Sequence, residues 1–224
     1  TLIVKRIKGV KRPALSPLLP TVKSGWIMLI DCGANTDCKP QYLQQFGVMA
    51  SAYMQSVMGV ENPRISLLNN GEEAEKGCEL TKAAYKLLSA APINFTGNCE
   101  AREVLSGEFD ALVCDGFVGN VVLKYTEGLA SSMMAMLKTE LTADFKSKIG
   151  AALSMDAFRR FKKKMDYKEV GGAPLLGING CVIKAHGSSD AKAFASAIRQ
   201  AELFVKGNVN PKIAEAIASL PDEE

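Results

Sequence analysis

The sequence has 224 residues, of which 47% are hydrophobic and 23% are charged, and this composition is typical of a globular protein with one large domain or two small ones. Its 27 basic and 24 acidic residues give a formal net charge of +3, well short of the concentrated basic charge of a nucleic-acid-binding domain. We therefore expect no nucleic acid partner. Because the chain opens with Thr1-Leu2-Ile3-Val4, without an initiator methionine, we expect it to be part of a longer protein.

Patterns typical of strands and helices alternate along the chain. Residues 11–20 are expected to form a turn-rich connection, and the apolar run at residues 26–31 is typical of a buried strand. In chain order, we predict further strands at residues 64–69, 110–115 and 181–184, and helices at residues 41–58, 72–89, 118–142 and 188–206. Short strands separated by longer helices favour parallel crossovers, so the predicted fold class is α/β.

A basic segment at residues 138–168 interrupts this pattern. It carries nine basic and four acidic residues, with aromatic and aliphatic side chains interleaved among the charges. We expect two short helices meeting near residues 150–152, which protrude between the core segments 1–137 and 169–224. The residues expected to contact an anionic membrane surface or an acidic carrier protein are Phe145, Ile149, Leu153, Phe158, Arg159, Arg160, Phe161, Lys162, Lys163 and Lys164. Packing of the helix pair on its own domain or across a dimer is the alternative.

The six cysteines include no CxxC pair, and the chain has a single histidine, His186. We therefore expect buried, reduced thiols and no metal site. The sequence also lacks GxGxxG, GxxxxGK[ST] and GxSxG, so it supports neither a dinucleotide site, nor a Walker-type site, nor a serine nucleophile.

Five loops that combine glycine with small polar residues stand at expected strand ends, where open α/β sheets bind ligands. They lie at residues 31–35, 69–73, 96–98, 115–120 and 186–189. Glycine lets backbone N–H groups approach an anion, and a following helix adds partial positive charge, so such loops could bind phosphate. Each of them could also be an ordinary turn.

These loops, together with other short motifs, resemble the phosphate acyltransferases of bacterial phospholipid synthesis. The most specific matching segments are Asp115-Gly116-Phe117-Val118-Gly119-Asn120-Val121-Val122-Leu123-Lys124 and Gly171-Gly172-Ala173-Pro174-Leu175-Leu176-Gly177, and another is Gly9-Val10-Lys11-Arg12-Pro13-Ala14. Members of this family extend further upstream, so the resemblance implies that the N-terminal portion is missing from this chain.

The resemblance implies both an activity and a fold. Inorganic phosphate would attack a long-chain acyl thioester on acyl carrier protein, and the acyl phosphate would feed a downstream membrane glycerol-3-phosphate acyltransferase. The implied fold is a three-layer α/β/α sandwich with a mostly parallel sheet, like the phosphotransacetylases and the isocitrate and isopropylmalate dehydrogenases. The protein would be a cytoplasmic homodimer, peripherally associated with the inner face of the cell membrane, and would use no cofactor. An acyl-CoA-dependent enzyme and a non-catalytic scaffold are the alternatives.

The reaction requires a site that binds the phosphate anion, groups that stabilise the oxyanion, and a proton for the departing thiolate. We expect Lys184, His186 and Asn120 to be catalytic, because Lys184 and His186 should point to the same side of a strand and His186 could protonate the thiolate. His186 could instead cap the following helix. The expected substrate-binding residues are Asn69, Asn98, Gly116, Gly119, Lys124, Gly171, Gly172 and Ala173. Glu72 and Glu73 are expected at the start of a helix rather than in the site.

Overall fold

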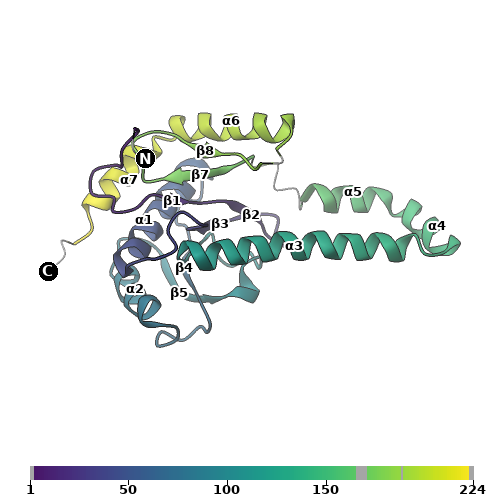
Figure 1. Ribbon diagram of the computed structural model, residues 1–224, viewed down its shortest axis with the longest axis horizontal. Coiled ribbons are helices and arrows are strands. Elements are labelled where there is room, and N and C mark those ends of the chain that lie inside the picture. The colour runs from purple at the N-terminus through teal and green to yellow at the C-terminus, as the bar shows by residue number, and fades with distance from the viewer. Residues whose placement is uncertain (1–2, 165–170, 188, 222–224) are drawn as a thin grey trace. The chain divides into compact units, whose positions relative to one another are not determined.

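The computed structural model describes residues 3–164, 171–187 and 189–221, and the chain divides into two compact units (Figure 1). The first unit consists of Thr1–Asn120 and Tyr167–Glu224, and the second of Val121–Asp166. The second unit therefore includes most of a long helix that precedes the basic segment.

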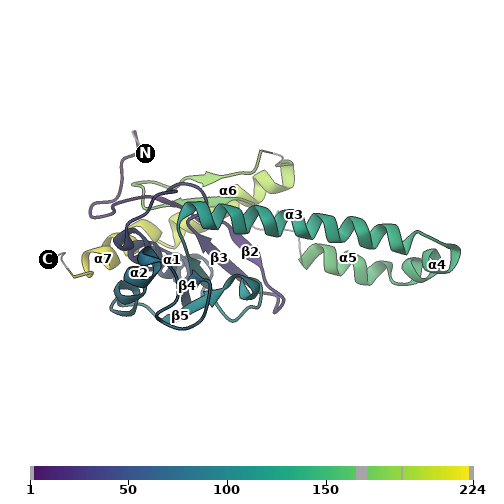
Figure 2. The same cartoon turned by 60° about the horizontal axis from the view of Figure 1, so that its bottom comes forward.

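A five-stranded sheet lies at the centre of the first unit, and Figure 2 shows its strands from a second direction. The strands follow one another across the sheet in the order β2 (Leu18–Pro20), β3 (Trp26–Ile30), β6 (Ala111–Val113), β4 (Ile65–Asn69) and β5 (Phe95–Glu100). All neighbouring pairs are parallel except β2 with β3, which confirms the predicted α/β class with a mostly parallel sheet.

Helix α1 (Pro40–Val57) forms the core of this unit, because it contacts β3, β4 and β6. Its side chains at Phe46, Met49 and Tyr53 are fully buried, as their helical spacing predicts. The helices α2 (Glu79–Ser89) and α7 (Val209–Ala218) pack against α1. At Gly47 an added Cβ would lie 2.6 Å from Leu88, so glycine permits the close approach of α1 and α2.

A second, antiparallel sheet joins β1 (Ala14–Leu15), β7 (Ala173–Leu176) and β8 (Ile183–Lys184), and helix α6 (Ala191–Lys206) packs against β8 (Figure 1). Strands β1 and β2 correct the expectation that residues 11–20 form only a connection. They are short, and prolines at 13, 17 and 20 obscure the alternating pattern of a strand.

Two other predictions of local structure are wrong. Helix α2 begins at Glu79, so Glu72 and Glu73 lie in a loop and not at a helix start. Residues 96–98 lie inside β5 instead of following a strand. The sequence interpretation also missed α7 and the short 3-10 helix η1 (Ala101–Glu103).

The second unit contains most of α3 (Gly116–Leu141), together with α4 (Phe145–Leu153) and α5 (Met155–Lys164). Figures 1 and 2 both show α5 running back along α3. The two short helices meet at Ser154, so the turn lies just beyond the predicted residues 150–152. Every side chain of this unit whose exposure is described is at least partly exposed. Among the described residues, no helix has the length and apolar character needed to cross a bilayer.

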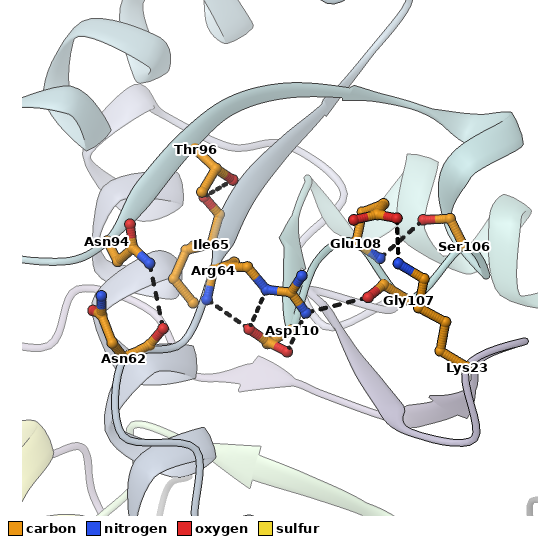
Figure 3. A network of polar contacts seen from close by, with 10 residues as sticks. All are labelled: Lys23, Asn62, Arg64, Ile65, Asn94, Thr96, Ser106, Gly107, Glu108 and Asp110. Atoms are coloured by element: carbon orange, nitrogen blue, oxygen red, sulfur yellow. Dashed lines mark hydrogen bonds and ion pairs between the residues drawn. The ribbon is translucent and has the colours of Figure 1, made fainter.

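An ion pair holds the amino ends of β4 and β6 together (Figure 3). Arg64 donates to both carboxylate oxygens of Asp110, from Nε and from a terminal guanidinium nitrogen, over 2.9 Å each. The backbone N–H of Arg64 also donates to Asp110 over 2.7 Å. Arg64 therefore acts as an ion-pair partner at the amino ends of these strands, at the opposite end from the loops 31–35, 69–73 and 115–120.

This ion pair should make stability depend on pH. Burial raises the pKa of Asp110, but the hydrogen bonds and charge of Arg64 outweigh burial, so the net shift is below the ordinary value of 3.8. A carboxylate whose pKa is lower in the folded than in the unfolded protein stabilises the fold at pH values above its unfolded-state pKa. This stabilisation is lost as the pH falls through the folded-state pKa. We expect Asp110→Asn to cost about 1.5–3 kcal/mol at pH 7 and progressively less below pH 3.8.

Chemical denaturation of both proteins across pH 2–7 would measure this effect. The control is Glu108→Gln, which removes the exposed carboxylate of the neighbouring Lys23–Glu108 pair and should leave stability almost unchanged. A cost for Asp110→Asn that stays constant across this pH range would contradict the assignment.

Candidate active site

The carboxyl ends of β3, β6, β4 and β5 meet at one edge of the large sheet, because these strands are parallel. The loop 31–35 follows β3, and α3 begins directly after β6. Asn69 is the last residue of β4, and Asn98 lies in the adjacent strand β5. Three of the segments singled out in the sequence, residues 31–35, 69–73 and 115–120, therefore lie at the edge where open α/β sheets bind ligands.

The buried carboxylate of Asp31 organises the loop after β3. One oxygen accepts the backbone N–H groups of Leu15 (2.8 Å) and Ala34 (3.2 Å). The other accepts the backbone N–H and the side-chain amide of Asn35, over 2.6 and 2.9 Å. Burial raises the pKa of Asp31, and these hydrogen bonds oppose the rise. Asp31 thus fixes the position of the loop beside the first turn of α3.

Two glycines let the first turn of α3 lie directly on that loop. An added Cβ at Gly119 would lie 1.9 Å from the backbone oxygen of Asp31 and 2.8 Å from the sulfur of Cys114. A Cβ at Gly116 would lie 2.7 Å from the backbone oxygen of Asn35. The Asn120 side chain is next to Gly33, and Asn120 is exposed. Gly116 and Gly119 therefore have a packing role, which leaves the Asn120 amide as an exposed polar group at this edge.

The backbone N–H groups at the start of α3 already have partners. Asp115 accepts those of Phe117 and Val118, each over 2.9 Å, and so caps the helix. Gly116 donates its N–H to the backbone oxygen of Asn35 over 2.7 Å. An anion bound by these N–H groups would have to displace the Asp115 carboxylate. Side chains at this edge are therefore better placed to bind phosphate than the helix N-terminus.

The Asn69 and Asn98 side chains hold the loop between β4 and α2. The Asn69 amide nitrogen donates to Asn98 Oδ1 and to the backbone oxygen of Lys76, each over 3.1 Å. Asn98 donates to the backbone oxygen of Glu73 over 2.7 Å. Both amide hydrogens of Asn69 are used in this way, so its geometry fits a structural role better than a direct contact with substrate.

The predicted residues Gly171, Gly172 and Ala173 lie at the small sheet. Gly171 has a φ of +89°, and an added Cβ there would lie 2.3 Å from the backbone nitrogen of Ala197 in α6. A Cβ at Gly172 would lie 2.7 Å from Ile183. Ala173 pairs with Lys184 in the ladder between β7 and β8. Gly171 and Gly172 therefore allow the beginning of β7 to lie close to α6 and β8.

The remaining predicted residues are exposed. Lys184 ends β8, and β1 and β7 lie between it and the loop after β3. His186 follows β8, but Asp190 caps α6 by accepting the N–H of Ala193 over 2.9 Å, so helix capping does not explain His186. Lys124 forms an ion pair with Glu127 over 2.8 Å.

Two of the thiols near this edge, those of Cys38 and Cys114, are unsuited to nucleophilic catalysis. Burial, with the nearby negative charges of Asp115 and Asp31, raises the pKa of Cys38 to about 12. Burial also raises the pKa of Cys114 well above its ordinary value. None of the six cysteines forms a disulfide, but Cys78 is exposed, contrary to the expectation of burial. Among the described residues, no group of three or more His, Cys, Asp or Glu side chains could hold a metal ion.

A family model described as "Fatty acid synthesis protein" matches residues 1–212. The chain belongs to the fatty acid synthesis protein family.

Curated relatives of this family are similar over nearly all of the chain. The chain is 56% identical over 218 residues to a protein of Clostridium perfringens strain SM101 and 52% identical over 223 residues to one of Alkaliphilus oremlandii, both named "Phosphate acyltransferase". It spans 64% and 66% of the length of these relatives.

Solved structures show the same fold at low sequence identity. The EutD phosphotransacetylase from Staphylococcus aureus aligns with a TM-score of 0.54 at 16% identity, over 96% of this chain and 57% of that one. A branched-chain phosphotransacylase from Enterococcus faecalis aligns with a TM-score of 0.52 at 17% identity, over 86% of this chain and 66% of that one. These alignments confirm that this family member has a phosphotransacetylase-like fold.

The sequence interpretation assigned no role to Asp31, Asp115 or Arg12. Asp115 stands between a strand and a helix, which is a recognisable capping signal. Asp31 follows an apolar run, but its partner Leu15 is 16 residues away and no local pattern connects them. Arg12 belongs to a family motif and to a run of cations, and the Tyr42 ring lies under its guanidinium group at 5.7 Å.

Proposed function

We propose that the protein containing this chain transfers an acyl group from a thioester to inorganic phosphate, producing an acyl phosphate and a free thiol. The observation that carries this proposal is the 56% identity to a relative named "Phosphate acyltransferase", across 97% of the chain. That similarity extends over the loops at the carboxyl edge of the sheet. The family description, which refers to fatty acid synthesis, favours a fatty acyl group.

The reaction needs no nucleophile from the protein. A phosphate oxygen attacks the thioester carbonyl carbon, a C–O bond forms, and the C–S bond breaks as the oxyanion collapses. The thiolate leaves with the bonding electrons and takes up a proton. The high pKa of Cys38 is compatible with this route, because catalysis then depends on positioning and electrostatic stabilisation.

Three side chains are proposed to carry the chemistry. Asn120 is exposed beside Gly33 at the carboxyl edge, where its amide could donate a hydrogen bond to phosphate or to the oxyanion. Lys184 supplies a positive charge that could balance the phosphate or the oxyanion. His186 is proposed to protonate the departing thiolate, because an imidazole can both accept and donate a proton. Replacing His186 with asparagine should lower the rate of phosphate-dependent thiol release.

We propose acyl carrier protein as the acyl donor, with acyl-CoA as the alternative. Both present a thioester on the same kind of flexible arm, so they differ chiefly in the surface that the enzyme must recognise. The downstream consumer would be a membrane glycerol-3-phosphate acyltransferase, since an acyl phosphate is an activated acyl donor with an apolar chain.

We propose that the protein forms a homodimer and attaches peripherally to the cytoplasmic face of an anionic membrane. Exposed apolar side chains in the second unit support both proposals. Val121, Tyr125, Leu129 and Met133 follow one another at helical spacing along α3, and all four side chains are exposed. Phe145, Leu153 and Phe161 are also exposed beside basic residues. Apolar stripes of this kind usually mark an interface. Sedimentation equilibrium and flotation with anionic vesicles would test the two proposals separately.

Release of free thiol from palmitoyl acyl carrier protein, measured with and without phosphate, tests the function. We expect the complete natural protein to release thiol only when phosphate is present and to form acyl phosphate in equal amount. Palmitoyl-CoA in the same assay distinguishes the two donors. Thiol release that does not require phosphate, or no release from a folded protein, would reject the proposed reaction.

A further inference from the structure

We infer that a basic surface at the start of the chain docks the acidic carrier protein that brings the thioester to the site. This basic N-terminal patch consists of Lys5, Arg6, Lys8, Lys11, Arg12 and Lys39. The inference rests on the proposed function, because it names the partner surface of the same site.

The charge of the patch is concentrated and only weakly balanced. Residues 5–12 contain five cations and no acidic residue. Between residues 3 and 42 the only acidic side chains are Asp31, which is buried, and Asp37, which is exposed. Within the described part of the chain, no carboxylate forms an ion pair with Lys5, Lys8 or Lys39.

Contacts within the first unit connect four of these cations, Arg6, Lys11, Arg12 and Lys39. The Arg6 guanidinium donates to the backbone oxygen of Lys11. The Arg12 guanidinium lies 5.7 Å from the centre of the Tyr42 ring, and Tyr42 donates its N–H to the backbone oxygen of Lys39 over 2.9 Å. The patch therefore continues from the first residues of the chain to the beginning of α1.

The core of the protein holds the patch in a defined shape. Gln45, a buried residue of α1, accepts the N–H of Lys11 over 2.8 Å and donates to the backbone oxygen of Gly9 over 3.0 Å. Ile7 and Val10 are buried, and the N–H of Val10 donates to the oxygen of Ile7 over 3.1 Å. A surface ordered before binding loses less conformational entropy when the partner arrives.

The patch directly adjoins the candidate active site. The backbone oxygen of Pro13, the residue after Arg12, accepts a hydrogen bond from the Asn35 side chain over 2.7 Å. Leu15, two residues further on, binds the Asp31 carboxylate. A carrier protein on the patch would therefore hold its thioester arm beside the carboxyl edge of the sheet.

The composition of the patch favours an acidic protein over a membrane. The apolar residues between Lys5 and Arg12 are Ile7 and Val10, and both are buried, so the exposed apolar side chains next to this stretch are those of Ile3 and Val4, which precede it. Complementary charge alone is enough to steer an acidic protein and orient it.

A pair of charge-reversal variants of the complete natural protein tests the inference. The patch variant is Lys8→Glu with Lys39→Glu. The matched control is Lys82→Glu with Lys86→Glu, which reverses two exposed lysines on α2. Both variants change the net charge equally. The probes are fluorescently labelled acyl carrier protein for direct binding, and its palmitoyl thioester and the neutral thioester S-octanoyl-N-acetylcysteamine for turnover.

We expect the patch variant to bind the carrier protein at least about tenfold more weakly than the wild type, and its KM for the palmitoyl carrier to rise by at least about tenfold. In the control variant, both quantities should stay within about twofold of the wild type. With the neutral thioester, the two variants should give the same kcat/KM as each other.

Equal carrier affinity in the two variants would overturn the inference. So would a patch variant that loses binding to anionic vesicles while its carrier affinity matches the control. If the wild type releases no thiol from either substrate, the proposed reaction fails, while the direct binding measurement still decides whether the patch docks the carrier.

Discussion

Alanine in place of Gly119 should destabilise the first unit by at least about 3 kcal/mol or prevent it from folding. The added Cβ would lie 1.9 Å from the Asp31 backbone oxygen and 2.8 Å from the Cys114 sulfur, and both neighbours are buried. The nearest atom belongs to the backbone of β3 and its loop, so it cannot rotate away as a flexible side chain can. The free energy of unfolding, measured by chemical denaturation, or the yield of folded protein, would show the effect.

Gly128→Ala is the matched control, because Gly128 lies in the same helix with no atom within 4 Å of an added Cβ. Alanine favours helix more than glycine by about 1 kcal/mol, so this variant should be as stable as the wild type or slightly more stable. Equal stability of the two variants would show that α3 does not pack on the Asp31 loop as described.

Asn in place of Asp31 should cost about 3 kcal/mol of stability and strongly reduce phosphate-dependent thiol release. The carboxylate accepts four hydrogen bonds from N–H groups, and a side-chain amide would direct its own N–H₂ at two of these donors. The loop 31–35 would then lose its fixed position beside Gly116 and Asn120. Denaturation and steady-state rates of the purified variant would measure both effects.

Asp37→Asn makes the same chemical change nearby, at an exposed position, and should alter stability by less than about 0.5 kcal/mol. If Asp31→Asn were as stable and as active as this control, the four hydrogen bonds would not be what orders the loop.

Periodicity and loop composition were sufficient to predict the main elements of the sheet. The apolar runs form β3, β4 and β6, which are buried except at Trp26 and Asn69, and the apolar stripe of α1 is visible from its 3.6-residue spacing. Strand β5 was harder to predict, because its sequence Phe-Thr-Gly-Asn-Cys-Glu contains turn-forming residues. Its place in the sheet depends on pairing with β4, which is a tertiary contact.

The candidate site was only partly predictable for the same reason. Glycine next to a polar residue marked the carboxyl edge of the large sheet at residues 31–35, 69–73 and 115–120, but not at 96–98 or 186–189. It did not reveal what each glycine does. Gly119 and Gly171 accommodate backbone atoms of distant segments, and Asn69 binds a loop instead of facing outward. These roles depend on contacts between segments far apart in the chain, so they become visible only when the strands are assembled.

The large sheet keeps its ion pair and its candidate site at opposite ends of the same strands. Arg64 and Asp110 precede β4 and β6, whereas Asn69 and Asp115 stand at or beyond their carboxyl ends. A strand of five residues, such as β4, separates the two ends by roughly 17 Å. Protein engineers could therefore select stabilising substitutions around the amino ends of β4 and β6 without altering the loops that would meet the substrate.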